Sequence, residues 1–207
     1  MWPWIGQCHE GSRWKRHLLF ANAIGFGLLG LLMSIITHDS SLALPVLARI
    51  VREPSTDNPT PLRRIDPTCR MRGWQELGRQ VDEVRAALQA QGIEPVIAAS
   101  RWNYASELAF YCQGHPQVYS LGSALWDRHS QFDIWRPNPL ADPDEFRGRT
   151  FIFIDVGGRP PEMEQAFEQV DATRRVWHME SGQPIAFWDV TVCRGYRGIR
   201  SADQKKY

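Results

Sequence analysis

The sequence predicts an α/β protein with a three-layer, mostly parallel open sheet, preceded by one transmembrane helix. Three stretches indicate this fold. Residues 18–37 are twenty uncharged and largely apolar residues, and residues 101–119 carry apolar side chains at helical spacing between two short apolar runs. Residues 150–156 (TFIFIDV) are apolar on both faces, which is typical of a central strand.

The first stretch is long enough to cross a membrane. At about 1.5 Å per residue, twenty helical residues span a hydrocarbon core of about 30 Å. A cleavable signal peptide is the alternative, because small residues follow at positions 40–43, but its apolar region is normally shorter. Residues 25–30 match a GxGxxG dinucleotide fingerprint by letter. They lack a preceding strand, so we interpret them as glycines at helix–helix contacts.

Basic residues place residues 1–17 in the cytoplasm. Arg13, Lys15 and Arg16 precede the apolar run, and positive charge favours the cytoplasmic side. The bias is small, because further arginines follow the run. We therefore expect a single-pass protein of the inner (cytoplasmic) membrane with an extracytoplasmic soluble domain. Residues 38–64 form a juxtamembrane segment and linker, in which residues 42–51 either rest on the membrane surface or dock on the domain.

The soluble α/β domain is expected over residues 65–193. An amphipathic helix at 73–91 leads to a strand at 93–99, and the βαβ unit follows. Later elements are assigned from periodicity and turn residues: a short strand at 132–135, a strand at 150–156, a helix at 162–170, and an antiparallel edge hairpin of strands 175–179 and 184–193. Residues 194–207 are expected to be a flexible tail.

Composition excludes several classes. The net charge is +1 over 207 residues and no dense Lys/Arg stripe occurs, so nucleic acid is not an expected partner. The four cysteines lie far apart without a CxxC pair, and the histidines stand on separate elements. We therefore predict no metal site and no cofactor, and no disulfide framework is indicated.

Two groups of residues are candidates for ligand binding. Arg101 and Asn103 follow a strand and open a helix, where anionic or hydroxyl groups are often bound. Gln131, Asp133 and Trp135 combine aromatic and hydrogen-bonding side chains, a combination that suits a sugar ring. The alternatives are an ion pair between Arg101 and a surface carboxylate, and loop aromatics that pack onto the core. No residue is assigned a catalytic role.

Four strings together resemble a known family: residues 66–74 (DPTCRMRGW), 105–111 (ASELAFY), 131–135 (QFDIW) and 151–156 (FIFIDV). Their order resembles the extramembrane C-terminal domain, with its last membrane helix, of bacterial glycosyltransferase family 39-like proteins, relatives of the dolichyl-phosphate-mannose–protein mannosyltransferases. The resemblance implies a membrane transferase that uses a polyprenyl-phosphate-linked sugar. Its catalytic acidic residue lies in a first external loop that has no counterpart in this chain.

The resemblance therefore predicts an accessory extracytoplasmic domain that lacks the catalytic loop. Its expected partners are the lipid bilayer, the polyprenyl-phosphate sugar or its acceptor, and the missing membrane portion of the transferase. The alternative is a self-standing, membrane-anchored binding or scaffold protein without enzymatic activity. A third interpretation, a secreted enzyme, requires cleavage after Ala43 and a cleft with perturbed titratable groups.

Overall fold

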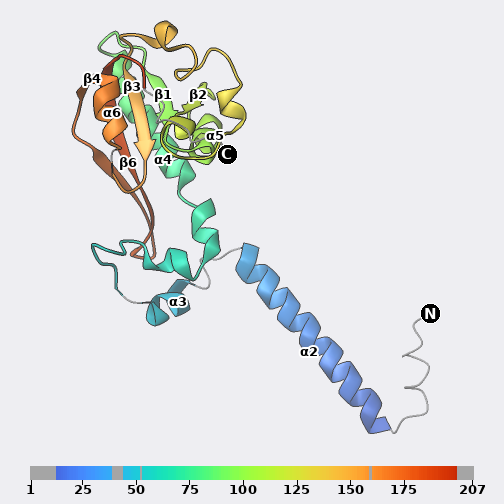
Figure 1. Cartoon of the computed structure of the whole chain (residues 1–207). Helices are drawn as coiled ribbons and strands as arrows, with labels where there is room; N and C mark the ends of the chain where they lie inside the picture. Colours follow the sequence, from blue (N-terminus) through green and yellow to red (C-terminus); the bar gives the residue numbers. More distant parts are fainter. Residues whose placement is uncertain (1–12, 39–43, 52, 159, 200–207) are drawn as a thin grey trace. The chain divides into compact units, whose positions relative to one another are not determined.

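The chain divides into two compact units, residues 1–52 and 53–207. A computed structural model describes residues 13–38, 44–51, 53–158 and 160–199, and all statements below concern these residues (Figure 1). The described part of the first unit consists of helix α2 (Arg13–His38) and the short helix α3 (Leu44–Ile50). The predicted cytoplasmic segment lies largely outside the described residues, because residues 1–12 precede the start of α2.

Helix α2 is the one described helix that is long and apolar enough to cross a membrane. Its 26 residues include the whole predicted span and extend it at both ends. Large apolar side chains are exposed along its length, among them Phe20 at 68% and Phe26 at 74%. A helix that is apolar on all sides is typical of a membrane span or a buried core helix, and the exposure of these side chains argues against the second case.

The second unit is built on a six-stranded mixed sheet in the order β2-β1-β3-β6-β4, with β5 also pairing β6. The strands are β1 (Val96–Ala99), β2 (Val118–Ser120), β3 (Phe151–Asp155), β4 (Phe167–Val170), β5 (Arg174–Glu180) and β6 (Gln183–Tyr196). Strands β2, β1 and β3 are parallel, whereas β3, β4 and β5 each run antiparallel to β6. The α/β class, the parallel βαβ unit and the antiparallel pairing of β5 with β6 are confirmed. The hairpin as a whole does not form the expected edge of the sheet, because β6 also pairs with β3 and β4. Parallel pairing is limited to one half of the sheet.

Hydrophobic side chains pack on both faces of the sheet. Helices α4 (Trp74–Gln89) and α5 (Trp102–Tyr111) contribute to the core on one face, together with Ile97 and Ile152. The short helix α6 (Pro161–Ala166) and the 3-10 turn η7 (Pro143–Phe146) contribute to the core on the other face. Because β1 and β3 are covered on both sides, they are apolar at nearly every position, as the sequence predicted.

Three expected elements differ from the structure. The expected strand at 132–135 is a 3-10 turn, η6 (Gln131–Asp133), because the Asp133 and Ser130 side chains cap its backbone. The expected helix at 162–170 ends at Ala166, since Phe167 pairs with Tyr196 and begins β4. The expected flexible tail begins too early, because β6 continues to the fully buried Tyr196. Residues 200–207 lie outside the described residues.

Gly73 joins the 3-10 turn η4 (Pro67–Met71) to α4 at a point of very close packing. Its φ angle is +85°, in the left-handed region that favours glycine. A Cβ atom at this position would lie 2.7 Å from Cγ of His178 and 2.8 Å from Cη2 of Trp188. The β5–β6 hairpin therefore packs directly against this backbone. Trp188 also contacts Trp74, with ring centroids 5.1 Å apart.

Replacing Gly73 by alanine should destabilise the domain strongly. The backbone angle and the overlap with His178 and the buried Trp188 together are expected to cost roughly 2–5 kcal/mol of unfolding free energy. Gly92→Ala is the matched control, because its φ is +77° but no atom lies within 4 Å of the added Cβ. That variant should lose only about 1–2 kcal/mol. Urea unfolding followed by tryptophan fluorescence measures both, and equal losses would contradict the packing argument.

Candidate binding groove

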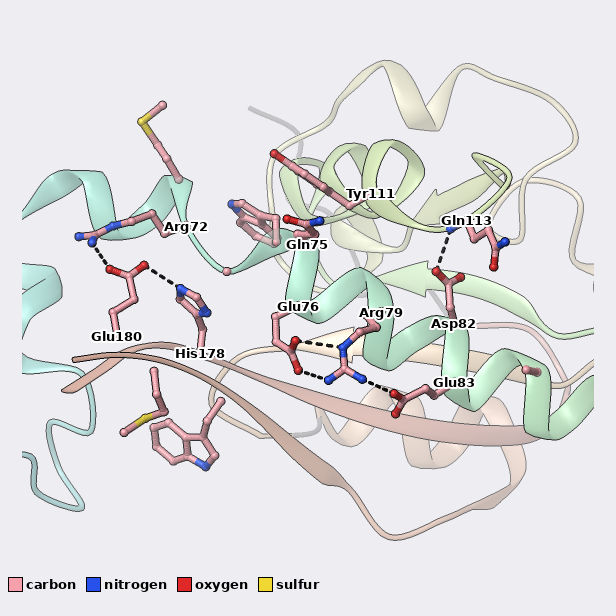
Figure 2. Close-up of a pocket in the computed structure, with 16 residues that line it drawn as sticks. Arg72, Gln75, Glu76, Arg79, Asp82, Glu83, Tyr111, Gln113, His178 and Glu180 are labelled. Atoms are coloured by element: carbon pink, nitrogen blue, oxygen red, sulfur yellow. Dashed lines mark hydrogen bonds and ion pairs between the residues drawn. The ribbon is translucent and has the colours of Figure 1, made fainter. Parts of the chain in front are cut away.

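A groove of about 1160 Å³ lies between α4 and β5 (Figure 2). Residues from η4 and from the end of α5 complete its walls. Sequence reasoning did not find this groove, because the polar face of α4 has the pattern of an ordinary solvated helix face. The only sequence feature that draws attention to this region is the string 66–74, which contributes to the family resemblance but does not indicate a binding site.

Arg72 connects one end of the groove to the hairpin. Its guanidinium donates to a carboxylate oxygen of Asp66 at 2.5 Å and to Glu180 at 2.5 Å. The other oxygen of Glu180 lies 2.8 Å from Nε2 of His178. Asp66 also accepts from the backbone N–H of Thr68 and so caps η4. This chain of charged groups fixes η4 against the end of β5, as Figure 2 shows in part.

A second row of charges follows α4. Arg79 donates to Glu76 at 2.6 Å and also binds Glu83, one helical turn further on. The hydrogen bond from Arg79 lowers the pKa of Glu76, so this carboxyl is held in its charged form. Asp82 accepts from the backbone N–H of Gln113 at 2.8 Å, which joins α4 to the end of α5. These contacts hold the charged groups of α4 in fixed positions along the groove.

The groove walls combine this charge with aromatic surface. Trp74 is almost fully buried at the base of α4, whereas Tyr111 is 38% and Trp177 is 40% exposed. The lining includes four carboxylates (Glu76, Asp82, Glu83, Glu180) and two guanidiniums (Arg72, Arg79). The excess of carboxylates gives the groove a negative character, and the aromatic rings provide apolar contact area.

A second cluster lies at the carboxyl ends of β1 and β3. The connections of these two strands leave the sheet in opposite directions, the position where open α/β sheets commonly bind ligands. The Ser100 hydroxyl donates to Asp155 at 2.5 Å, and burial raises the pKa of the Asp155 carboxyl. Beside Asp155, the buried Asp189 accepts two hydrogen bonds from the Arg175 guanidinium, at 2.7 and 3.0 Å, and one from the Gly158 N–H.

The predicted site residues occupy two separate elements. Arg101 is exposed and precedes α5, with its guanidinium 6.0 Å from the centre of the Tyr104 ring, and Asn103 is half-buried in the first turn. The η6 loop contains the other three, Gln131, Asp133 and Trp135. A link between the two elements is Arg128, whose guanidinium lies 5.0 Å from the Trp102 ring.

Within the η6 loop, the predicted sugar-binding residues have local structural partners. Asp133 accepts from the backbone N–H of Ser130 at 2.6 Å and from the Ser123 hydroxyl. Trp135 packs edge-on against Phe132, with ring centroids 5.0 Å apart, and stays 55% exposed. The structure therefore uses Asp133 to close the loop. The proposal that this trio contacts a ligand remains a prediction.

Metal and thiol chemistry find little support in the described residues. Among them, no group of three or more His, Cys, Asp and Glu side chains could hold a metal ion. Cys69, Cys112 and Cys193 are buried. Burial raises the pKa of the Cys112 thiol to about 12 and also raises that of Cys69. Cys8 lies outside the described residues.

No family model, curated protein or solved structure matches this chain. The resemblance to family 39-like glycosyltransferases therefore remains an expectation from the sequence, and the function of the chain rests on the geometry of its site.

Removing the Arg72 guanidinium should destabilise the domain, because Asp66 and Glu180 would lose their shared partner in a largely buried place. We expect Arg72→Met to lower the unfolding free energy by roughly 3 kcal/mol. Arg147→Met is the control, because Arg147 pairs with Asp144 on the surface, where such pairs contribute about 1 kcal/mol or less. Similar losses in urea unfolding of the two variants would show that the Arg72 network is not structural.

The raised pKa of Asp155 predicts a pH-dependent effect on stability. A carboxyl whose pKa is raised on folding stabilises the fold while it is protonated, and this contribution is lost as pH rises through the folded-state pKa. Asp155→Asn should therefore be at least as stable as the wild type at neutral pH, and its advantage should shrink in acid. Urea unfolding from neutral to acidic pH measures this difference. A variant that is less stable only at neutral pH would contradict the prediction.

Proposed function

We propose that this chain is a membrane-anchored, non-catalytic binding domain that serves a family 39-like glycosyltransferase. The observation that carries the binding role is the groove between α4 and β5, which combines exposed aromatic rings with an excess of carboxylates. Pockets that bind ligands typically join apolar walls with a few fixed polar groups. The link to the transferase rests on the four sequence strings and on the apolar helix that precedes the domain.

In this proposal, α2 spans the inner membrane once and the three-layer α/β domain stands on the extracytoplasmic side. The bilayer is then one partner, and the membrane portion of the transferase is another. The groove would support or gate the binding of the acceptor or of the polyprenyl-phosphate sugar. Arg101, Asn103, Gln131, Asp133 and Trp135 stay candidates for further contacts.

The charge state of the groove favours binding over acid–base catalysis. A general acid needs a carboxyl whose pKa is raised toward neutrality. In the groove, Arg79 instead lowers the pKa of Glu76, and Glu180 is paired with Arg72. Asp155, whose pKa is raised, is half-buried and hydrogen-bonded to Ser100 at the carboxyl ends of the strands. It is not among the residues that line the groove.

A self-standing anchored scaffold is the second candidate. It is favoured by the membrane-length helix among the described residues, which is sufficient to anchor the domain by itself. An immunoblot of native membranes distinguishes the two functions. A band well above 23.8 kDa, or a larger complex on native gels, supports the transferase. A 24 kDa band without such a complex supports the scaffold.

Anchoring and the absence of catalysis are tested on the full chain expressed in bacterial membranes. We expect it to stay in the pellet after alkaline carbonate extraction and to be digested by protease added to spheroplasts. We also expect no sugar transfer from a polyprenyl-phosphate donor by these membranes above that of membranes without the chain. Release by carbonate would overturn the anchor. Transfer by the chain alone would overturn the non-catalytic role.

A further inference from the structure

Strand β5 has an open edge. Its seven residues pair with β6 from Arg174–Val190 to Glu180–Gln183, with one shift of register between His178 and Met179. No other backbone hydrogen bond joins residues 174–180 to the rest of the described chain. At the start of β5, the Arg174 side chain donates a hydrogen bond to Gln80 of α4. The part of the edge that is open to another strand therefore begins near Val176. Unpaired strand edges are ready positions for an added strand.

Two hollows border this edge. Side chains alternate along β5, and His178 and Glu180 contribute to the groove described above. On the other side, Trp177 and Met179 line a second hollow of about 670 Å³, together with Pro54 and Pro59. Trp177 and Met179 also belong to the first groove, so both hollows meet along the edge of β5.

The two hollows differ in chemistry. The first carries the excess of carboxylates from α4 and β5, which favours basic side chains. Three prolines, Trp177 and Met179 line most of the second hollow, and Ser55, Thr56 and Arg175 complete it. The Arg175 guanidinium is directed onto the Phe187 ring, 4.5 Å from its centre. This second surface favours apolar side chains. An extended strand presents successive side chains to opposite faces, so one peptide can satisfy both hollows.

We propose that the free edge of β5 binds an extended peptide in which basic and apolar side chains alternate. The peptide adds a strand to the sheet, its basic side chains facing the carboxylates of α4 and its apolar side chains facing Trp177 and Met179. This inference rests on the proposed binding role and names its ligand class. A sugar ring would use the aromatic surfaces without using the unpaired backbone.

The test uses the full chain in detergent micelles and a fluorescent heptapeptide of alternating lysine and valine. Fluorescence anisotropy should show saturable binding, and a glutamate–valine peptide should bind at least tenfold more weakly. The double variant Glu76→Gln/Glu83→Gln should weaken lysine–valine binding by about fivefold or more. Asp144→Asn/Glu145→Gln removes the same charge from the distant turn η7 and should leave the affinity unchanged. Equal affinity for both peptides, or equal effects of both double variants, would overturn the charge assignment.

N-methylated peptides test the backbone pairing. Methyl groups on one alternate set of peptide amides should abolish binding, and those on the other set should be tolerated, because only one edge of an added strand meets β5. Equal tolerance of both sets would overturn strand addition, and so would stronger binding of an oligosaccharide at the same groove. A dimer on size exclusion that the peptide cannot dissociate would assign the edge to a second copy of this chain. If peptide binding fails while the chain stays anchored and inactive in transfer, only this inference falls.

Discussion

The second unit depends on β6, a strand that is hydrogen-bonded along both of its edges. Its middle, from Asp189 to Cys193, pairs with β3 on one side. Its two ends pair with β5 and β4 on the other. A 14-residue strand with this pairing joins the parallel half of the sheet to every later element of the chain. Its pairings with β3 and β4 join residues more than 20 positions apart, so β6 carries much of the non-local order of the domain.

Packing around β6 also sets the position of the groove. Trp188 on β6 contacts Trp74 at the first turn of α4, and Gly73 lets the two elements approach without a side chain between them. The α4 face that remains outside this contact carries Glu76, Arg79 and Glu83. The groove is therefore a consequence of helix packing against a hairpin that extends past the end of β3. Its charges are held in place by ion pairs on one helix and by the Arg72 network at its end.

Local sequence patterns predicted the elements in which apolar residues recur at one regular spacing, either that of a helix or that of a strand. The apolar helix, the βαβ unit around α5, strand β3 and the hairpin turn at Ser181 and Gly182 all follow from spacing and turn residues. Strand β4 did not, because Phe167 is recruited by pairing with Tyr196, a contact that no local window contains. The groove was not predicted from the sequence, for a related reason. His178 and Glu180 share one face of β5, and only the hairpin brings them to residues more than 100 positions earlier in the chain, such as Arg72.

The buried cysteines have a consequence for where this domain can operate. A thiolate is the reactive form of cysteine, and burial raises the pKa of Cys112 to about 12 and that of Cys69 above its ordinary value. Both side chains are also shielded, with exposures of 1% and 0%. In the folded domain both thiols therefore lie in the core in their less reactive protonated form, away from oxidants in solution. Once folded, the domain is therefore expected to keep these two thiols in an oxidising compartment as well as in a reducing one.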